Sequence, residues 1–209
     1  MENTDLYLVY KLINNANFPH QVWQKNGLTI VKPVLRNLGF AAQYRPFAAW
    51  CIYHFGRVFI NDRFMMVACF KDGRMVHRTC VFPGFYKFPF MDKNDLQLGD
   101  IWTREDHRGK GLASRAIGYV LSLSDFKDTI FWYVVEPGNT ESIRLAEKHG
   151  FAVSCSAEKK KRLGLSFLGW YDVSPLSAGT SQTTHARHDY QQYETRIHSS
   201  SNNSKQGVK

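Results

Sequence analysis

The sequence has no segment of the kind that spans a membrane or directs secretion. None of its apolar runs approaches the ~20 residues that a membrane-spanning helix requires. The chain begins Met-Glu-Asn-Thr-Asp, without the basic residues that open a signal peptide. These absences predict a cytoplasmic protein that makes no stable insertion into a membrane.

Cysteine is scarce and scattered. The 4 cysteines form no Cys-x-x-Cys pair and no Cys/His cluster at the spacing of metal ligands. They are expected to be reduced thiols in the core. The sequence therefore predicts no zinc site and no other metal, and it contains no internal repeat.

The chain does have enough apolar residues for one large core. It is 209 residues long, with 44% hydrophobic and 14% aromatic residues, so a single domain is expected. From Pro175 onward the composition changes to Ser, Thr, Asn, Gln and His, with almost no aliphatic residues. Such a segment cannot bury enough surface to offset the entropy lost on ordering it. We predict one domain over residues 1–174 and a disordered polar tail over 175–209.

The chain is strongly basic. Its formal net charge is +9 at pH 7, which attracts anions such as phosphorylated small molecules, nucleic acids or anionic membrane surfaces. No basic motif is interleaved with aromatic residues, so nucleic acid is not an expected partner. The one dense basic run, residues 159–162, is expected in a solvated hairpin turn.

Several segments have clear secondary-structure patterns. Either 6–12 or 28–35 could supply the first strand, and a helix is expected from about Pro46. Two strand-like runs around Asp72-Gly73 predict a β-hairpin. Three later predictions are a strand buried on both faces at 129–135, a helix over 139–149 that Asn139 caps and Gly150 ends, and antiparallel strands at 151–156 and 163–173.

Residues 82–91 are rich in Phe and Pro and are too proline-rich for an interior strand. Two interpretations stay open. The rings could form a stacking platform for a ligand, or the loop could be held in place by burying its own rings.

Residues 95–124 contain the most informative pattern in the sequence. An alternating apolar strand is followed by a glycine-containing turn and then by a helical pattern. The first N–H groups of a helix have no internal partner and carry partial positive charge, so the main chain can hold a phosphate there. Gly109 and Gly111 leave the backbone open to close approach, and Arg108 and Lys110 add charge.

Two motifs carry a resemblance to a known family. The spacing Arg-x-x-Gly-x-Ala at Arg108, Gly111 and Ala113 resembles the pyrophosphate-binding motif of the GNAT superfamily of acyl-CoA N-acyltransferases. The stretch from Asn139 to Phe151 resembles a later motif of the same family. The resemblance implies an α/β (α+β) fold: a mixed, mostly antiparallel twisted sheet flanked by helices, with a splayed central strand pair that binds acetyl-CoA. The alternative for the first motif is a solvated glycine-rich loop.

The resemblance also implies which residues contact acetyl-CoA. Main-chain groups of the central strand would pair with the pantetheine arm, the turn would hold the pyrophosphate, and the later motif would meet the cofactor from the other side. The predicted cofactor-binding residues are Ile101, Trp102, Thr103, Arg108, Gly109, Lys110, Gly111, Leu112, Ala113, Ser114, Asn139 and Ser142.

The catalytic residues are less well marked. Asp100 is the first candidate for a general base and His77 the second. Asp100 could instead pair with a basic residue of a neighbouring strand, and His77 could simply be packed. Many relatives use a Tyr to protonate the departing CoA sulfur at the position of Ala146. Tyr133, His149 or water could replace it, and we expect no dedicated acid because a thiol of pKa ~8.5 is already a tolerable leaving group.

The function that follows is transfer of an acetyl group from acetyl-CoA to a small amine by direct attack in a ternary complex. Residues 77–103 are loosely similar to members thought to act on nucleotide-linked amino sugars in bacterial surface-polysaccharide pathways. Alternatives are a protein, peptide or other small-amine N-acetyltransferase, and a non-catalytic acyl-CoA-binding module. The sequence leaves the oligomeric state open.

Overall fold

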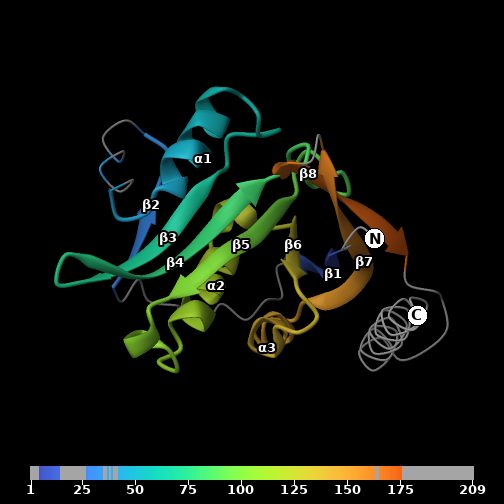
Figure 1. The fold of residues 1–209 in the computed structure, drawn as a ribbon. Helices are drawn as coiled ribbons and strands as arrows, with labels where there is room; N and C mark the ends of the chain where they lie inside the picture. Colours follow the sequence, from blue (N-terminus) through green and yellow to red (C-terminus); the bar gives the residue numbers. More distant parts are fainter. Residues whose placement is uncertain are drawn as a thin grey trace, which may run out of the picture.

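The computed structural model describes residues 5–14, 27–34, 37, 39, 42–162 and 165–175. Eight strands form one sheet in the order β2-β3-β4-β5-β6-β1-β7-β8, and only β5 and β6 pair in parallel among the described pairs. The predicted mixed, mostly antiparallel sheet flanked by helices is confirmed (Figure 1). The strands are β1 Asp5–Asn14, β2 Leu28–Val31, β3 Met65–Lys71, β4 Arg74–Pro83, β5 Leu96–Thr103, β6 Thr129–Val135, β7 Ala152–Arg162 and β8 Leu165–Pro175, and the helices are α1 Pro46–Phe55, α2 Leu112–Leu121 and α3 Thr140–Lys148.

Both candidates for the first strand form strands. β2 lies at one edge of the sheet, whereas β1 lies inside it, antiparallel to β6 on one side and to β7 on the other. Residues from the start of the chain therefore sit beside the last strand before α3. This insertion places Tyr10 opposite Tyr133.

The sheet has two covered faces with different chemistry. On the first, which we call the α2 face, helices α2 and α3 pack over aliphatic residues such as Val81, Leu96 and Leu98. On the second, which we call the aromatic face, α1 and the 84–91 segment pack over rings such as Phe82 and Trp132. Figure 1 shows α1 and α2 on opposite sides of the sheet.

The local predictions were confirmed at the turns and helix ends. The hairpin between β3 and β4 turns at Asp72 (φ 51°) and Gly73 (φ 72°). Asn139 caps α3 by accepting a hydrogen bond from the Ser142 N–H at 3.1 Å, and Gly150 follows the helix with φ 81°. Each position has the residue that its backbone geometry favours.

Three predictions need correction or fall outside the description. The basic run 159–162 was expected in a turn, but it forms the end of β7, where cross-strand pairing with β8 overrides its charge. Strand β4 continues to Pro83, into the segment predicted to be too proline-rich for a strand. β8 ends at Pro175, the first residue of the predicted tail, and residues 176–209 lie outside the described residues.

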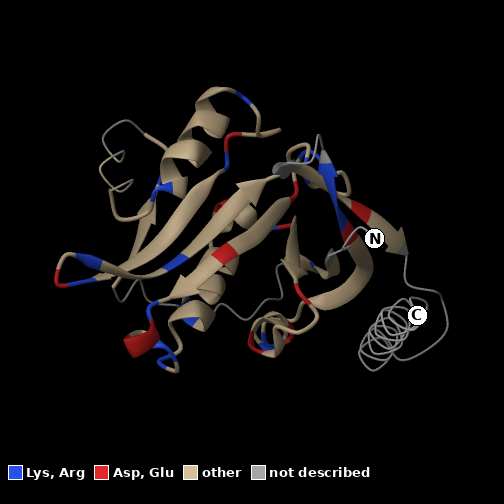
Figure 2. Cartoon of the chain, in the orientation of Figure 1, with Lys and Arg blue, Asp and Glu red and all other residues tan. Residues whose placement is uncertain are grey.

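The described residues hold no group of three or more His, Cys, Asp or Glu that could bind a metal ion. None of their helices is long and apolar enough to cross a membrane. The four free thiols are Cys51, Cys69, Cys80 and Cys155. Figure 2 shows Lys and Arg spread over the β3–β4 hairpin, the turn before α2 and strand β7, interspersed with acidic residues.

Candidate cofactor and acceptor site

Strands β5 and β6 separate after three paired positions. Their parallel register runs through Leu96–Phe131 and Gln97–Trp132 and stops at Leu98–Tyr133. Beyond that point β5 stays paired with β4, and β6 stays paired with β1. The two edges that face each other across the gap therefore carry main-chain groups available to a ligand. A ligand with amides along an extended arm can add to such an edge as a strand does.

A β-bulge lies where the gap opens. Arg78 pairs with Trp102 and Cys80 with Gly99, so two steps along β4 match three along β5. The extra residue is in β5, and Asp100 has φ 48°. A bulge redirects the main chain locally. Here it reorients the main chain between Gly99 and Trp102, beside the gap.

The turn that follows β5 provides no hydrogen-bond acceptors for the first main-chain N–H groups of α2. Gly109 (φ 73°) and Gly111 (φ 72°) precede the helix. The first N–H bonded back into the turn is that of Arg115, to the Gly111 carbonyl at 3.0 Å, and none of the N–H groups of residues 109–114 has an acceptor among the described residues. A Cβ added at either glycine would meet nothing within 4 Å. These open N–H groups can bind an anion.

The basic side chains of this turn are tied to its main chain. The Arg108 Nε donates to the Thr103 carbonyl at 3.2 Å, and the Lys110 Nζ donates to the Asp106 carbonyl at 2.8 Å. Both side chains are exposed beside the glycines. They add positive charge at the end of the gap between β5 and β6.

The later motif lies across the gap from the turn. Ser142 is in the first turn of α3. Burial raises the pKa of Tyr133, and the nearby Ser142 hydroxyl partly offsets the effect. Ser114 is occupied elsewhere, because its hydroxyl lies 3.0 Å from the His149 Nε2.

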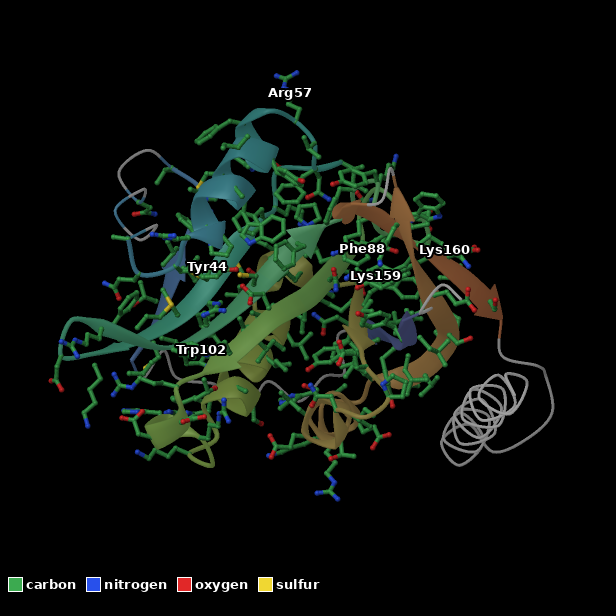
Figure 3. All side chains as sticks on the ribbon, viewed as in Figure 1. Tyr44, Arg57, Phe88, Trp102, Lys159 and Lys160 are labelled. Carbon is green, nitrogen blue, oxygen red and sulfur yellow. The ribbon has the colours of Figure 1, made fainter. Side chains whose placement is uncertain are left out.

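Asp100, the first candidate base, sits in an ion pair. Its carboxylate accepts hydrogen bonds from the Arg78 Nε at 3.1 Å and from the Arg78 Nη2 at 3.0 Å, and the Tyr44 hydroxyl donates to it as well. The guanidinium lies 4.1 Å from the centre of the Tyr44 ring and 4.9 Å from that of Trp102. Figure 3 labels Tyr44 and Trp102 on the aromatic face of the sheet. This is the pairing with a neighbouring strand that the sequence left open.

His77, the second candidate base, is enclosed. It is 0% exposed, its Nδ1 lies 2.8 Å from the Thr103 hydroxyl, and its Nε2 lies 3.0 Å from the Thr79 hydroxyl. Burial and the nearby Arg78 charge lower its pKa to about 4. The imidazole is therefore neutral at pH 7, and both of its nitrogens are hydrogen-bonded. This matches the alternative in which His77 is a packed residue of the core.

Ala146, which occupies the position of the usual general acid, is inaccessible to solvent. It is 0% exposed and packs in the α2-face core. His149 is also buried, and burial together with the Lys148 charge lowers its pKa to about 4. Of the side chains considered as proton donors, Tyr133 stands nearest to the gap, since it makes the last β5–β6 pair.

The aromatic segment 82–91 mainly buries its own rings. Phe85 and Phe88 are both 7% exposed, and their ring centres are 5.0 Å apart. Phe88 also stacks on Tyr171 at 5.4 Å, while Tyr86 is 42% exposed. The self-burial interpretation therefore describes most of this loop.

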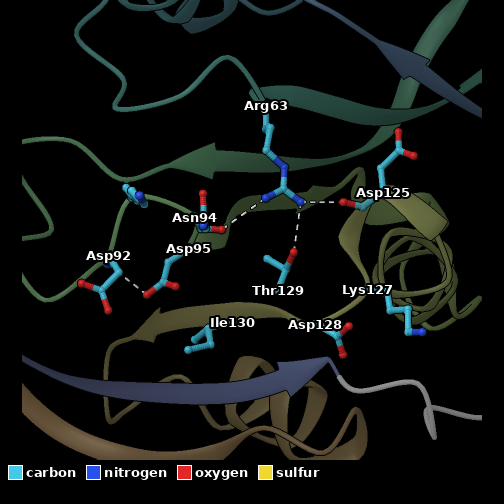
Figure 4. Close-up of a pocket in the computed structure, with 10 residues that line it drawn as sticks. Arg63, Asp92, Asn94, Asp95, Asp125, Lys127, Asp128, Thr129 and Ile130 are labelled. Atoms are coloured by element: carbon cyan, nitrogen blue, oxygen red, sulfur yellow. Dashed lines mark hydrogen bonds between the residues drawn. The ribbon is translucent and has the colours of Figure 1, made fainter.

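The sequence did not reveal Gln97, Arg78 or a cavity at the other end of the strand pair. The cavity has a volume of about 730 Å³ and is lined by residues near the starts of β5 and β6, among them Asp95, which precedes β5, and Thr129, which begins β6. Figure 4 shows Arg63 bonded there to the Asn94 and Asp125 carbonyls and to the Thr129 hydroxyl. No sequence motif marks the cavity. An alternation that places Gln97 and Arg78 on the aromatic face was the only available signal.

The free strand edges and the open helix terminus define a site for a phosphorylated ligand with an extended amide arm. Residues 31–151 match the family model described as the acetyltransferase (GNAT) family. The chain therefore belongs to this family. The superfamily resemblance carried by the two sequence motifs is confirmed.

Solved structures share the fold. A putative GNAT acetyltransferase from Novosphingobium aromaticivorans is 17% identical with a TM-score of 0.51, over 72% of this chain and 61% of that one. A GCN5-related N-acetyltransferase from Sphaerobacter thermophilus is 15% identical with a TM-score of 0.51, over 73% of this chain and 50% of that one. The chain thus spans less than two thirds of either structure. No curated protein sequence matches it.

Proposed function

We propose that the chain transfers an acetyl group from acetyl-CoA to the amine of a small acceptor, by direct attack in a ternary complex. The observation that carries the proposal is the separation of β5 from β6 beside the open N-terminus of α2. The residues fit acetyl-CoA, since the N–H groups of 109–114 can hold its pyrophosphate and the strand Ile101–Thr103 can pair with its pantetheine arm. We assign Asn139 and Ser142, at the start of α3, to the other side of the cofactor.

The placement of the candidate side chains supports attack through the gap. Tyr133 belongs to the core of the α2 face, the side on which the helix terminus lies. Asp100 contacts Tyr44 and Cys80, which belong to the aromatic face. The thiol would leave on one side of the sheet while the amine arrives from the other. The C–N bond forms as the C–S bond breaks, the sulfur takes the electron pair and a proton, and the amine nitrogen loses a proton.

The acceptor class is the least constrained part of the proposal. We keep an amino sugar, preferably nucleotide-linked, as the first choice. A sugar amine has a pKa below the ~10.4 of Lys, so it is partly neutral at pH 7 and needs little help from a general base. This suits a site where Asp100 is paired with Arg78 and His77 is enclosed. The basic surface suits a diphosphate. A peptide or another small amine is the alternative.

One observation favours a second candidate function. The carboxylate of Asp100 is held in an ion pair, both nitrogens of His77 are occupied, and Ala146 stands at the position of the usual acid. A non-catalytic acyl-CoA-binding module would have these properties.

Thiol release from acetyl-CoA, measured with amino-sugar nucleotides, polyamines, amino acids and peptides, separates these functions. We expect acceptor-dependent release with an amino sugar. Turnover with peptides alone would identify peptides, and not amino sugars, as the acceptor. Tight CoA binding without release for any amine would establish the binding module instead.

A further inference from the structure

Gln97 is a buried side chain whose amide oxygen has no hydrogen-bond partner among the described residues. It is 6% exposed, and the unpaired atom is Oε1. Leaving such an acceptor unpaired costs more than leaving it in water, and unpaired side-chain oxygens in native cores call for an explanation. An apolar side chain of the same size would fill this position without an unpaired oxygen. A role in ligand binding would explain why the position holds an amide instead.

The position of Gln97 points to the acceptor side of the gap. It pairs with Trp132 on β6 and with Phe82 on β4, and both rings belong to the aromatic face. Directly opposed residues share a face of the sheet. Gln97 therefore lies on the face that the acceptor would approach, one pair before the strands separate.

Gly99 leaves the backbone bare where this amide and the Phe82 ring pack against it. A Cβ at Gly99 would lie 3.4 Å from the Gln97 Nε2 and 3.3 Å from the Phe82 ring. Gly99 itself is half-buried, and the bulge at Asp100 follows it. The amide therefore stands over a bare backbone position at the point where the gap opens.

We propose that the Gln97 side-chain oxygen accepts a hydrogen bond from an N–H of the acceptor amine and orients its lone pair toward the thioester. The inference rests on the proposed N-acetyltransferase function and names the residue that recognises the amine. A neutral amide suits this task, because a carboxylate would favour the ammonium form, which has no lone pair for attack. The orphaned oxygen is then satisfied when the acceptor is bound.

The chain offers a matched control in Gln43. Its Nε2 donates to the Gly73 carbonyl at 3.2 Å, and its Oε1 accepts from the Met75 N–H at 2.9 Å, so this amide is fully engaged in structure. Gln97→Met and Gln43→Met remove the same group from an orphaned site and from a satisfied site. If Gln97→Met does not fold, Gln97→Leu removes the amide with a different shape.

The test titrates UDP-glucosamine, spermidine and glycinamide into CoA-saturated protein by calorimetry, alongside CoA titrations and thermal unfolding. For an amine that binds the parent, we expect Gln97→Met to weaken amine binding about tenfold. CoA affinity should stay unchanged, and the unfolding midpoint should stay the same or rise. Gln43→Met should lower the midpoint without changing amine affinity.

Three results would overturn the inference. Unchanged amine affinity in Gln97→Met, with a higher midpoint, would make the orphaned amide a packing defect only. Weaker binding of CoA in place of the amine would assign Gln97 to the cofactor. If none of the three amines binds the parent protein, the inference and the proposed function both fail, whereas the first two results leave the proposed function intact.

Discussion

Replacing Gly111 with alanine tests the anion site at the start of α2 against a control that shares its backbone geometry. Gly111 and Gly73 both have φ 72°, and a Cβ at either would meet nothing within 4 Å. Alanine at a left-handed position costs about 1–2 kcal/mol. Since 1 kcal/mol shifts the unfolding midpoint of a chain of this size by about 2–4 °C, both Gly111→Ala and Gly73→Ala should unfold about 2–8 °C lower.

CoA affinity should separate the two variants. At Gly111 the new methyl group stands at the free N–H groups that would hold the pyrophosphate. Losing one hydrogen bond to a charged group costs about 1.5–3 kcal/mol, or about 10- to 150-fold in affinity. Gly73 lies in the β3–β4 hairpin, so Gly73→Ala should bind CoA like the parent.

The assay is calorimetric titration of CoA into each variant at a temperature where both remain folded. Equal CoA affinities in Gly111→Ala and Gly73→Ala would refute the placement of the pyrophosphate at this turn. Equal unfolding midpoints in the two variants confirm that backbone strain is matched. Only the difference in affinity then reports on the ligand.

Three further predictions concern the proton chemistry. Tyr133→Phe should leave kcat within a few-fold of the parent if the thiolate departs unaided, whereas a loss of about 10²-fold or more would identify Tyr133 as a general acid. Asp100→Asn should lower kcat/KM mainly at low pH, with partial recovery as pH rises; if Asp100 acts only through its ion pair, adding Arg78→Gln should restore stability and activity together. The pKa values of His77 and His149 are lowered from 6.5 to about 4, so the unfolded chain binds more protons between these pH values, and the stability present above pH 6.5 should fall as pH drops toward 4. Urea unfolding at several pH values measures this loss, at most about 1.4 kcal/mol per pH unit for each histidine, and a slope that His77→Gln leaves unchanged would contradict it.

Local rules were enough to predict much of the fold. The Asp72-Gly73 turn, the Asn139 cap and the glycine turn before α2 each depend on residues within a few positions of one another. The position of β1 does not follow from such rules. Its apolar run suits a strand anywhere in a sheet, and pairing with both β6 and β7 depends on contacts more than a hundred residues away.

In the site, too, local features could be predicted and features that depend on distant residues could not. The sequence marked the turn at 108–111, because helix-terminus chemistry is local. It could not decide whether Asp100 would be free or paired, since the answer depends on Arg78 across the strand pair and on Tyr44 before α1. Gln97 gave no signal beyond its place in the strand alternation, because an orphaned oxygen is recognised only when every neighbour is in place.

Hydrogen–deuterium exchange with and without CoA tests the central claim most directly. If the cofactor lies between β5 and β6 with its pyrophosphate at the start of α2, CoA should slow exchange at residues 101–103 and 109–114, whose N–H groups border the gap or lack acceptors. Residues around the Arg63 cavity at the opposite end of these strands should exchange at the same rate with and without CoA. Protection at that cavity, with no change at 101–103 and 109–114, would contradict the proposed site.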